Sequence, residues 1–218
     1  MKAKMIIAAV ACFMLAAVNP SNLKADKQDR NADLFSKINI KGPVELILTQ
    51  GSLQSLSVEA DSDLINKITT NVKSKTLYVE VSGKNLDKKG RKIVVYVTIP
   101  SIDEVKATNA AKVTLQTPIH NAEGVEISLS GAATMKGVTV NAKSLSVALD
   151  GASSTSLTVD VTELKMKAAG ASELKITGKA QKISATANGA SNIDAYEFTY
   201  DKADTSSSGA ASIRLSKN

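Results

Sequence analysis

Large aromatic side chains are scarce in this sequence, which has no Trp, 4 Tyr and 3 Phe among its 218 residues. Such rings supply much of the buried volume in ordinary thick cores, so a core of that kind is excluded. Apolar residues still make up 43% of the chain, which is enough to exclude wholesale disorder. We therefore expect a scaffold that buries small and aliphatic side chains in thin layers.

Cysteine and histidine are nearly absent, with Cys12 and His120 the only residues of their types. A disulfide framework and thiol chemistry are thereby excluded, and a zinc site would lack its usual ligands. A Ser-His-Asp triad would depend on His120 alone. Because His120 follows Pro118, we expect it in a solvated loop. We predict no catalytic residue, no metal and no cofactor.

The N-terminus has the pattern of an export signal. Lys2 and Lys4 precede an apolar run at residues 5–18, and a polar segment follows. The run is too short to span a bilayer comfortably, so we expect a cleaved signal peptide at 1–25 and no membrane span in the mature chain. Cleavage is predicted after Ala25, with Ala17 as the alternative site.

A lipoprotein signal would make Cys12 the modified residue. Two features argue against lipidation: position 9 is Ala rather than the usual Leu, and the apolar run continues beyond Cys12. The sequence therefore predicts an exported protein of the periplasm, the cell surface or the extracellular medium, without a lipid anchor.

Part of the excess positive charge of the chain lies in the predicted signal peptide. The whole sequence has a formal charge of +6, but residues 1–25 contain three Lys and no acidic residue, so the mature chain carries only +3. A basic cluster at 84–92 is interrupted by Gly, Asn and Asp and predicts a solvated hairpin loop. Without a basic stripe and interleaved aromatics, we expect no nucleic-acid partner.

The mature chain divides into two parts. Residues 26–33 are polar and predict a flexible leader, after which 34–218 form one domain. Within 34–100, apolar residues alternate with polar ones in several runs separated by turn residues such as Gly42-Pro43, which predicts strands in irregular coils. Residues 101–218 are more regular, because they contain an internal repeat.

The repeat is a Gly-Ala-Ser or Gly-Ala-Ala triplet that recurs every 19 or 20 residues, beginning at Gly131, Gly151, Gly170, Gly189 and Gly209. Asn109-Ala110-Ala111 is a degenerate earlier copy. Around each triplet every second residue is apolar or small, which indicates a strand with one buried face. We predict that the glycines form the corners of the repeat.

This period fits one coil of a single-stranded parallel β-helix, an all-β solenoid in which coils stack about 4.8 Å apart. Equivalent residues should then form columns, with Leu174, Ile193 and Ile213 in one interior column. The alternative is a β-sandwich with evenly spaced strands. We favour the solenoid, with longer irregular strands in its N-terminal part.

From about Phe35 to Leu215 the sequence resembles the secreted autotransporter-adhesin head domains known as GIN or DUF2807, which are common in Bacteroidetes. The resemblance rests on the opening Phe35…Ile38-Asn39-Ile40-Lys41-Gly42-Pro43-Val44, on Gln50-Gly51, on Ile68-Thr69-Thr70-Asn71-Val72, on Val95-Tyr96-Val97-Thr98-Ile99-Pro100 and on the triplets. The family more often has Gly-Ser-Gly or Gly-Ala-Gly at the triplets. The resemblance implies a parallel β-helix over 34–218, export, an adhesive or surface role and no catalytic residues.

Two groups of residues are candidates for function. Tyr196, Phe198 and Tyr200 alternate on one strand and could form an exposed strip for a glycan or a surface protein, although covering the edge of the core is the favoured interpretation. Glu173 and Asp194 are 21 residues apart and could form a carboxylate pair on adjacent coils, or part of an exposed ladder of mixed charge. Such a pair would be expected in a polysaccharide-active enzyme.

We therefore predict a non-catalytic, adhesin-like or structural envelope module that binds a glycan or a surface protein through weak multivalent contacts. The alternative is a polysaccharide-active β-helix enzyme. Association with further copies of the chain through an exposed sheet face is a third possibility.

Overall fold

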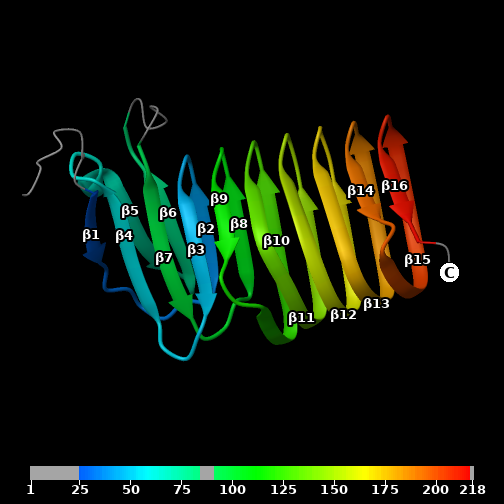
Figure 1. Cartoon of the computed structure of the whole chain (residues 1–218), viewed down its shortest axis with the longest axis horizontal. Helices are drawn as coiled ribbons and strands as arrows, with labels where there is room; N and C mark the ends of the chain where they lie inside the picture. The colour runs from blue at the N-terminus through cyan, green and yellow to red at the C-terminus, as the bar shows by residue number, and fades with distance from the viewer. Residues whose placement is uncertain (1–24, 84–90, 217–218) are drawn as a thin grey trace, which may run out of the picture.

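The computed structural model describes residues 25–83 and 91–216. These residues form an all-β solenoid of about six coils, in which strands from successive coils lie side by side along one long axis (Figure 1). This confirms the predicted fold class. Residues 1–24 of the predicted signal peptide, with Cys12, and residues 84–90 of the basic cluster lie outside the described residues.

Strands on one side of the solenoid form what we call the first wall. In spatial order it contains β1 (Ala25–Asp29), β4 (Ser55–Asp61), β7 (Ile93–Ile99), β3 (Glu45–Gln50), β9 (Lys112–Leu115), the first residues of β11 (Thr134–Leu149), β12 (Ser154–Ala168) and β13 (Glu173–Gly189), then β14 (Asn192–Ala195) and β16 (Ser212–Leu215).

The second wall lies opposite the first and also begins at the N-terminal end of the solenoid. It contains β5 (Ile68–Lys73), β6 (Thr76–Val81), β2 (Lys37–Lys41), β8 (Glu104–Thr108), β10 (Ile119–Ser130), the later residues of β11, β12 and β13, and finally β15 (Phe198–Gly209). A single 3-10 turn, η1 (Ile65–Lys67), precedes β5.

The long strands β11, β12 and β13 each bend from the first wall into the second, so one strand supplies most of a coil (Figure 1). Their pairing is parallel and, apart from an irregularity in β11 between Met135 and Val138, in register, so that inward-facing residues of successive coils stack in columns. The predicted interior column is confirmed, since Leu174 pairs with Ile193 and Ile193 with Ile213. Aliphatic columns of this kind exclude water without any large ring, which accounts for the scarcity of aromatics.

Each Gly-Ala-Ser triplet forms the tight turn between the two walls. The five glycines have φ between +72° and +76°, a backbone conformation that costs a residue with a side chain about 1–2 kcal/mol. The turns also stack directly on one another: the amide of Ala171 donates to the carbonyl of Gly151 at 2.7 Å, and a Cβ on Gly170 would lie 2.8 Å from that oxygen. Both the dihedral angle and the close approach therefore require glycine.

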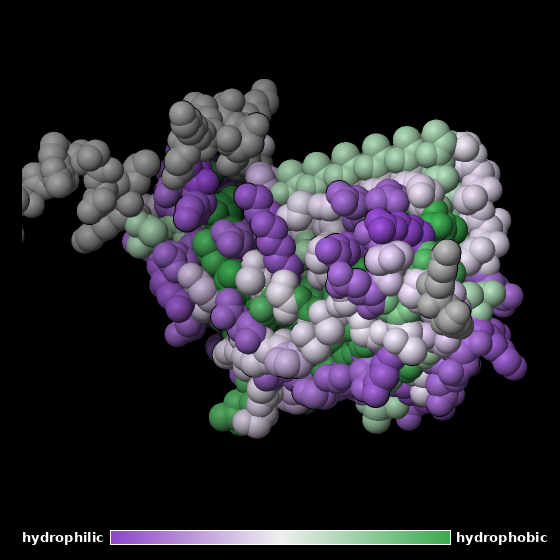
Figure 2. Space-filling view, turned by 45° about the vertical axis from the view of Figure 1, so that its right-hand side comes forward, coloured by the Kyte–Doolittle hydropathy of each residue, from purple (hydrophilic) through white to green (hydrophobic). Residues whose placement is uncertain are grey.

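The middle alanines of the triplets point outward and the third residues point inward. Ser153, Ser172 and Ser191 are almost fully buried, whereas the alanines that precede them are exposed. A pale green ridge of weakly hydrophobic surface along the upper edge of the molecule runs along these turns (Figure 2).

The N-terminal end departs from parallel stacking. β1 pairs antiparallel with β4, β4 pairs antiparallel with β7, and β5 pairs antiparallel with β6. The expectation of a flexible leader at 26–33 is therefore corrected for its first residues, because backbone pairing from Ala25↔Asp61 to Asp29↔Ser57 places them in a strand. Main-chain hydrogen bonds do not require an apolar sequence, so this polar segment gave no strand pattern.

Candidate functional site

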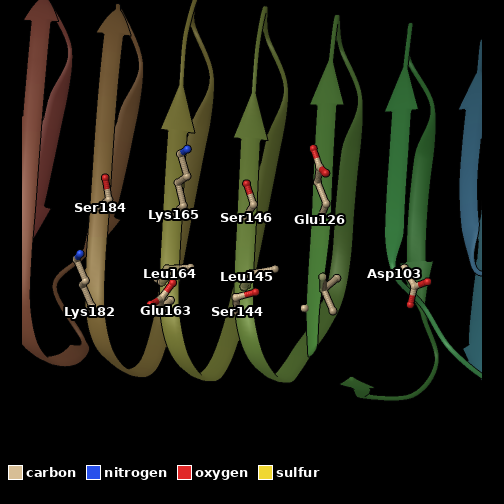
Figure 3. A pocket seen from close by; sticks show the side chains of 12 residues that line it. Asp103, Glu126, Ser144, Leu145, Ser146, Glu163, Leu164, Lys165, Lys182 and Ser184 are labelled. Atoms are coloured by element: carbon tan, nitrogen blue, oxygen red, sulfur yellow. The ribbon is translucent and has the colours of Figure 1, made fainter. Parts of the chain in front are cut away.

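A hollow lies on the outer face of the second wall, close to the bend where each long strand enters it (Figure 3). It has a volume of about 570 Å³ and extends across β10, β11, β12 and β13, with Asp103 at its N-terminal limit. Sites for small ligands commonly have volumes of about 300–1,000 Å³, so the hollow is large enough for a ligand of that size.

Two outward-facing ladders of residues line the hollow. The first contains, in register, Gly124, Ser144, Glu163 and Lys182, and the second, two residues further along each strand, contains Glu126, Ser146, Lys165 and Ser184. We call Gly124 and the three serines the floor, because their small side chains leave the space open. We call Glu126, Glu163, Lys165 and Lys182 the rim (Figure 3).

The rim combines two acidic with two basic side chains. None of the ion pairs among residues 25–83 and 91–216 includes a rim residue, although Glu163 and Lys182 are neighbours in the ladder. Charges that are not engaged with each other can interact with a partner at little cost of broken contacts. The arrangement therefore suits a polar partner that carries charged groups.

The N-terminal side of the hollow is shaped by Asn121. Its amide nitrogen donates to the carbonyl of Ile102 and to Oδ1 of Asp103, both at 3.0 Å. Its Oδ1 accepts from the amides of Glu123 at 2.9 Å and Gly124 at 3.2 Å. These bonds hold the irregular step in β10 between residues 121 and 124, which brings Gly124 to the floor.

At the N-terminal limit of the hollow, the titration of Asp103 is perturbed. Burial acts to raise its pKa, but hydrogen bonds from Ser36, Ser101 and Asn121 and the positive charge of Lys37 outweigh burial, so that the pKa lies below its ordinary value. The carboxylate is thus held ionised and already bonded, with Ser101 Oγ donating to its Oδ1 at 2.9 Å. This points to a structural role at the hollow.

The three C-terminal aromatic residues do not form one exposed strip. Phe198 begins β15 and is 2% exposed, within the core. Tyr200 packs against the core edge and donates from its hydroxyl to the carbonyl of Ser216 at 3.2 Å. Tyr196 lies in the preceding turn and is 54% exposed, with the Arg214 guanidinium 4.2 Å from its ring centre. Only Tyr196 could therefore contact a partner over much of its surface.

The acids singled out in the sequence do not form a carboxylate pair. Glu173 is in register with Asn192, whereas Asp194 is in register with Lys175 on one side and Arg214 on the other. Asp194 lies 4.0 Å from Arg214, which makes this an exposed ladder of mixed charge. Among the described residues, no cluster of three or more His, Cys, Asp or Glu side chains is placed to hold a metal ion.

His120 is in β10 rather than in the predicted loop. Its amide donates to Gln50 Oε1 at 2.7 Å and its carbonyl accepts from Gln50 Nε2 at 2.9 Å, while its side chain is exposed. The Gln50 side chain thus makes two hydrogen bonds to the backbone of His120, as the backbone of a neighbouring strand would. The sequence offered no signal for that bond, because it joins residues 70 positions apart.

Residues 34–218 match the family model of the "putative auto-transporter adhesin, head GIN domain". The chain belongs to this family. The match spans the whole solenoid that follows the first strand, including the hollow and the five glycine turns. A search of curated proteins found no match. No helix within the described ranges is long and apolar enough to cross a bilayer.

Solved structures with the same fold include proteins from two Parabacteroides species. The GIN chain is similar to a "putative adhesin" from Parabacteroides distasonis, with a TM-score of 0.80, 14% identity and coverage of 87% of this chain and 81% of that one. A "putative adhesin" from Parabacteroides merdae has a TM-score of 0.77 at 18% identity, covering 88% and 81%. A "putative lipid binding protein" from Parabacteroides distasonis has 0.78 at 16%, covering 89% and 82%. At these identities the likeness shows the fold.

Sequence reasoning missed the hollow. Its first ladder could have been found by aligning the repeats on the glycine that ends each one, which places Gly124, Ser144, Glu163 and Lys182 at equivalent positions. Outward positions of a solenoid are polar almost everywhere, however, so charge alone did not distinguish the rim from the rest of the exposed face.

Proposed function

We propose that this GIN domain is an exported, non-catalytic binding module that engages its partner in the hollow of the second wall. The observation that carries the proposal is the combination of a floor of small residues with a rim of two acids and two bases outside every ion pair of the described residues. The family supports a binding role, since its members are described as adhesin-like.

The chemistry of the hollow favours a charged, hydroxyl-rich partner, for which an acidic glycan is the leading candidate. Lys165 and Lys182 would bind its carboxylate or sulfate groups, and the floor serines would bond to its hydroxyls. No aromatic side chain lines the hollow, so stacking on a neutral sugar ring would make no contribution there. Repetition of small contacts across four coils would supply affinity through multivalency.

A glycan array probed with the purified chain, residues 26–218, tests this proposal. We expect binding to uronate-containing or sulfated glycans, with roughly a tenfold loss in Lys182→Gln, because charge-assisted contacts contribute about 1.5–3 kcal/mol. Lys167→Gln is the matched control, because Lys167 lies on the same wall outside the hollow. Equal loss in both variants, or no glycan bound above background, would contradict the proposal.

A polysaccharide-active enzyme is the second candidate, and it has one observation in its favour: Glu126 and Glu163 both line the hollow. The coil that carries Ser144 and Ser146 lies between them (Figure 3), which places their Cα atoms about 12 Å apart for coils of normal spacing. Carboxyl groups of glycosidases are about 5–9.5 Å apart. If the chain released reducing ends from acidic polysaccharides, and Glu163→Gln abolished this activity, the chain would be an enzyme rather than a binding module.

A further inference from the structure

The C-terminal end of the solenoid presents a long open strand edge. Among the described strands, β15 pairs only with β13 and β16 only with β14. Residues 201–210 are exposed throughout, including Ala203, Thr205 and Ser207. These three are in register with Ile183, Ala185 and Ala187, which are at most 1% exposed. The inward face of the last coil is therefore uncovered, and the free backbone groups of β15 are available for pairing.

The side chains of this edge indicate a polar contact. Where the preceding coil has Ile183, the last coil has Ala203, and the next inward positions carry hydroxyls. On the outward face, Lys202 and Asp204 flank Ala203. Neither is part of an ion pair within the described chain. An occupant of this edge would thus be held by main-chain hydrogen bonds and by these two charges.

We infer that the occupant is a second copy of this chain, paired through β15 in an antiparallel arrangement about a two-fold axis at Ala203. In this register Lys202 lies directly opposite Asp204 of the second copy, and the same contact occurs twice by symmetry. Centring the axis on residue 201, 202 or 204 would instead place two identical charges opposite each other. Charge complementarity therefore selects both the partner and the register.

The other end of the molecule does not offer an equivalent match. There the second wall ends at β5, which has six residues against the twelve of β15 and whose only charged residue is Lys73. Head-to-tail stacking would leave half of β15 unpaired and would generate an open filament. Pairing β15 with its own copy matches the two edges in length and closes the assembly at two chains.

Sedimentation velocity on the purified chain over a concentration series tests the dimer. We expect a monomer–dimer equilibrium whose dissociation constant rises at least about tenfold in Lys202→Asp, since two attractive contacts become repulsive. Asp204→Lys should have the same effect, and the double variant Lys202→Asp/Asp204→Lys should restore the dimer. A chain that stays monomeric at every concentration, or a double variant no better than the single ones, would overturn the inference.

A cysteine at the two-fold axis gives an independent readout, because the chain after residue 25 contains no other cysteine. Opposed residues of antiparallel strands have Cα atoms about 4.5–5.5 Å apart, within the range that a disulfide spans. Ala203→Cys should form a covalent dimer on mild oxidation. Thr199→Cys, an exposed residue of the same strand, is the control and should not. Equal cross-linking of both, or of neither, would contradict this register.

Discussion

The described residues up to 100 and residues 101–216 build the same two walls with different strand geometry. The first part contains three antiparallel pairs, β1 with β4, β4 with β7 and β5 with β6, whereas every pairing among the described strands from β8 onward is parallel. Antiparallel neighbours need only short connections, but parallel coils must return to the same wall each time. The second part therefore depends on a tight turn that is repeated, and the first part does not.

This difference determines where each part is sensitive to mutation. In the N-terminal part, stability resides in fully buried aliphatic side chains such as Ile38, Leu46 and Leu77. In the C-terminal part, it resides also in backbone geometry, because each glycine turn contacts the turn before it through main-chain atoms. Asn109 and Ala110, with φ of +56° and +65°, form the first turn of the series without a glycine.

Gly170→Val should have the largest effect of the changes considered. A side chain there adopts a left-handed conformation at a cost of about 1–2 kcal/mol, and its Cβ meets the Gly151 backbone at 2.8–3.0 Å, which adds about 1–3 kcal/mol. We expect unfolding free energy, measured in urea, to fall by about 4 kcal/mol. Asn109→Val, at the turn without a glycine, should cost clearly less. Equal losses would show that the two kinds of turn do not differ.

Phe198→Ala should follow, with a loss of about 3 kcal/mol for a large buried ring. Phe198 is in register with Gly178, the position of the preceding coil that has no side chain. Tyr196→Ala should cost less than about 1 kcal/mol, because it removes an exposed ring and one cation–π contact. Thermal denaturation of both variants measures the contrast, and a comparable loss of stability for Tyr196→Ala would assign that residue to the core.

The parts that sequence reasoning predicted are those in which a local pattern determines the structure. Alternation gave the buried faces, and the spacing of the triplets gave the coil length, because both follow from chain geometry alone. The strand β1 was missed because its pairing with β4 uses backbone groups that every residue carries. The hollow was missed because it depends on which of the outward polar side chains are small. It also depends on how four coils are aligned with one another, and the residue pattern of one coil does not indicate that alignment.

The link between the two parts should be sensitive to pH through Asp103, whose carboxylate accepts hydrogen bonds from Ser36 of the first part and from Asn121 of the second. Its folded pKa lies below its ordinary value, so the unfolded chain binds a proton more readily. The stabilisation is complete above the unfolded pKa, near 4, and is lost as pH falls through the folded pKa. Asp103→Asn should cost about 1 kcal/mol at pH 7, after allowance for solvent screening.

Urea unfolding between pH 7 and pH 2.5 measures this link. The difference in stability between the wild-type chain and Asp103→Asn should shrink as the solution becomes more acidic. Asp150→Asn serves as the control, because Asp150 is exposed and should give a difference that is small at every pH. A wild-type advantage that grows on acidification would have the wrong sign for a carboxylate with a lowered pKa.

The smallest effect is expected within the column of buried serines, and it should have opposite signs at two positions. Ser191 Oγ donates to the carbonyls of Ala168 at 3.0 Å and Asn188 at 2.9 Å, so Ser191→Ala should destabilise the chain by about 1 kcal/mol. Ser172 Oγ is buried without a partner among the described residues, so Ser172→Ala should be neutral or stabilising by under about 1 kcal/mol. Alanine fits this column, because Ala133 occupies it in an earlier coil. Differential scanning calorimetry resolves the two signs, and destabilisation in both variants would mean that the Ser172 hydroxyl is bonded in solution.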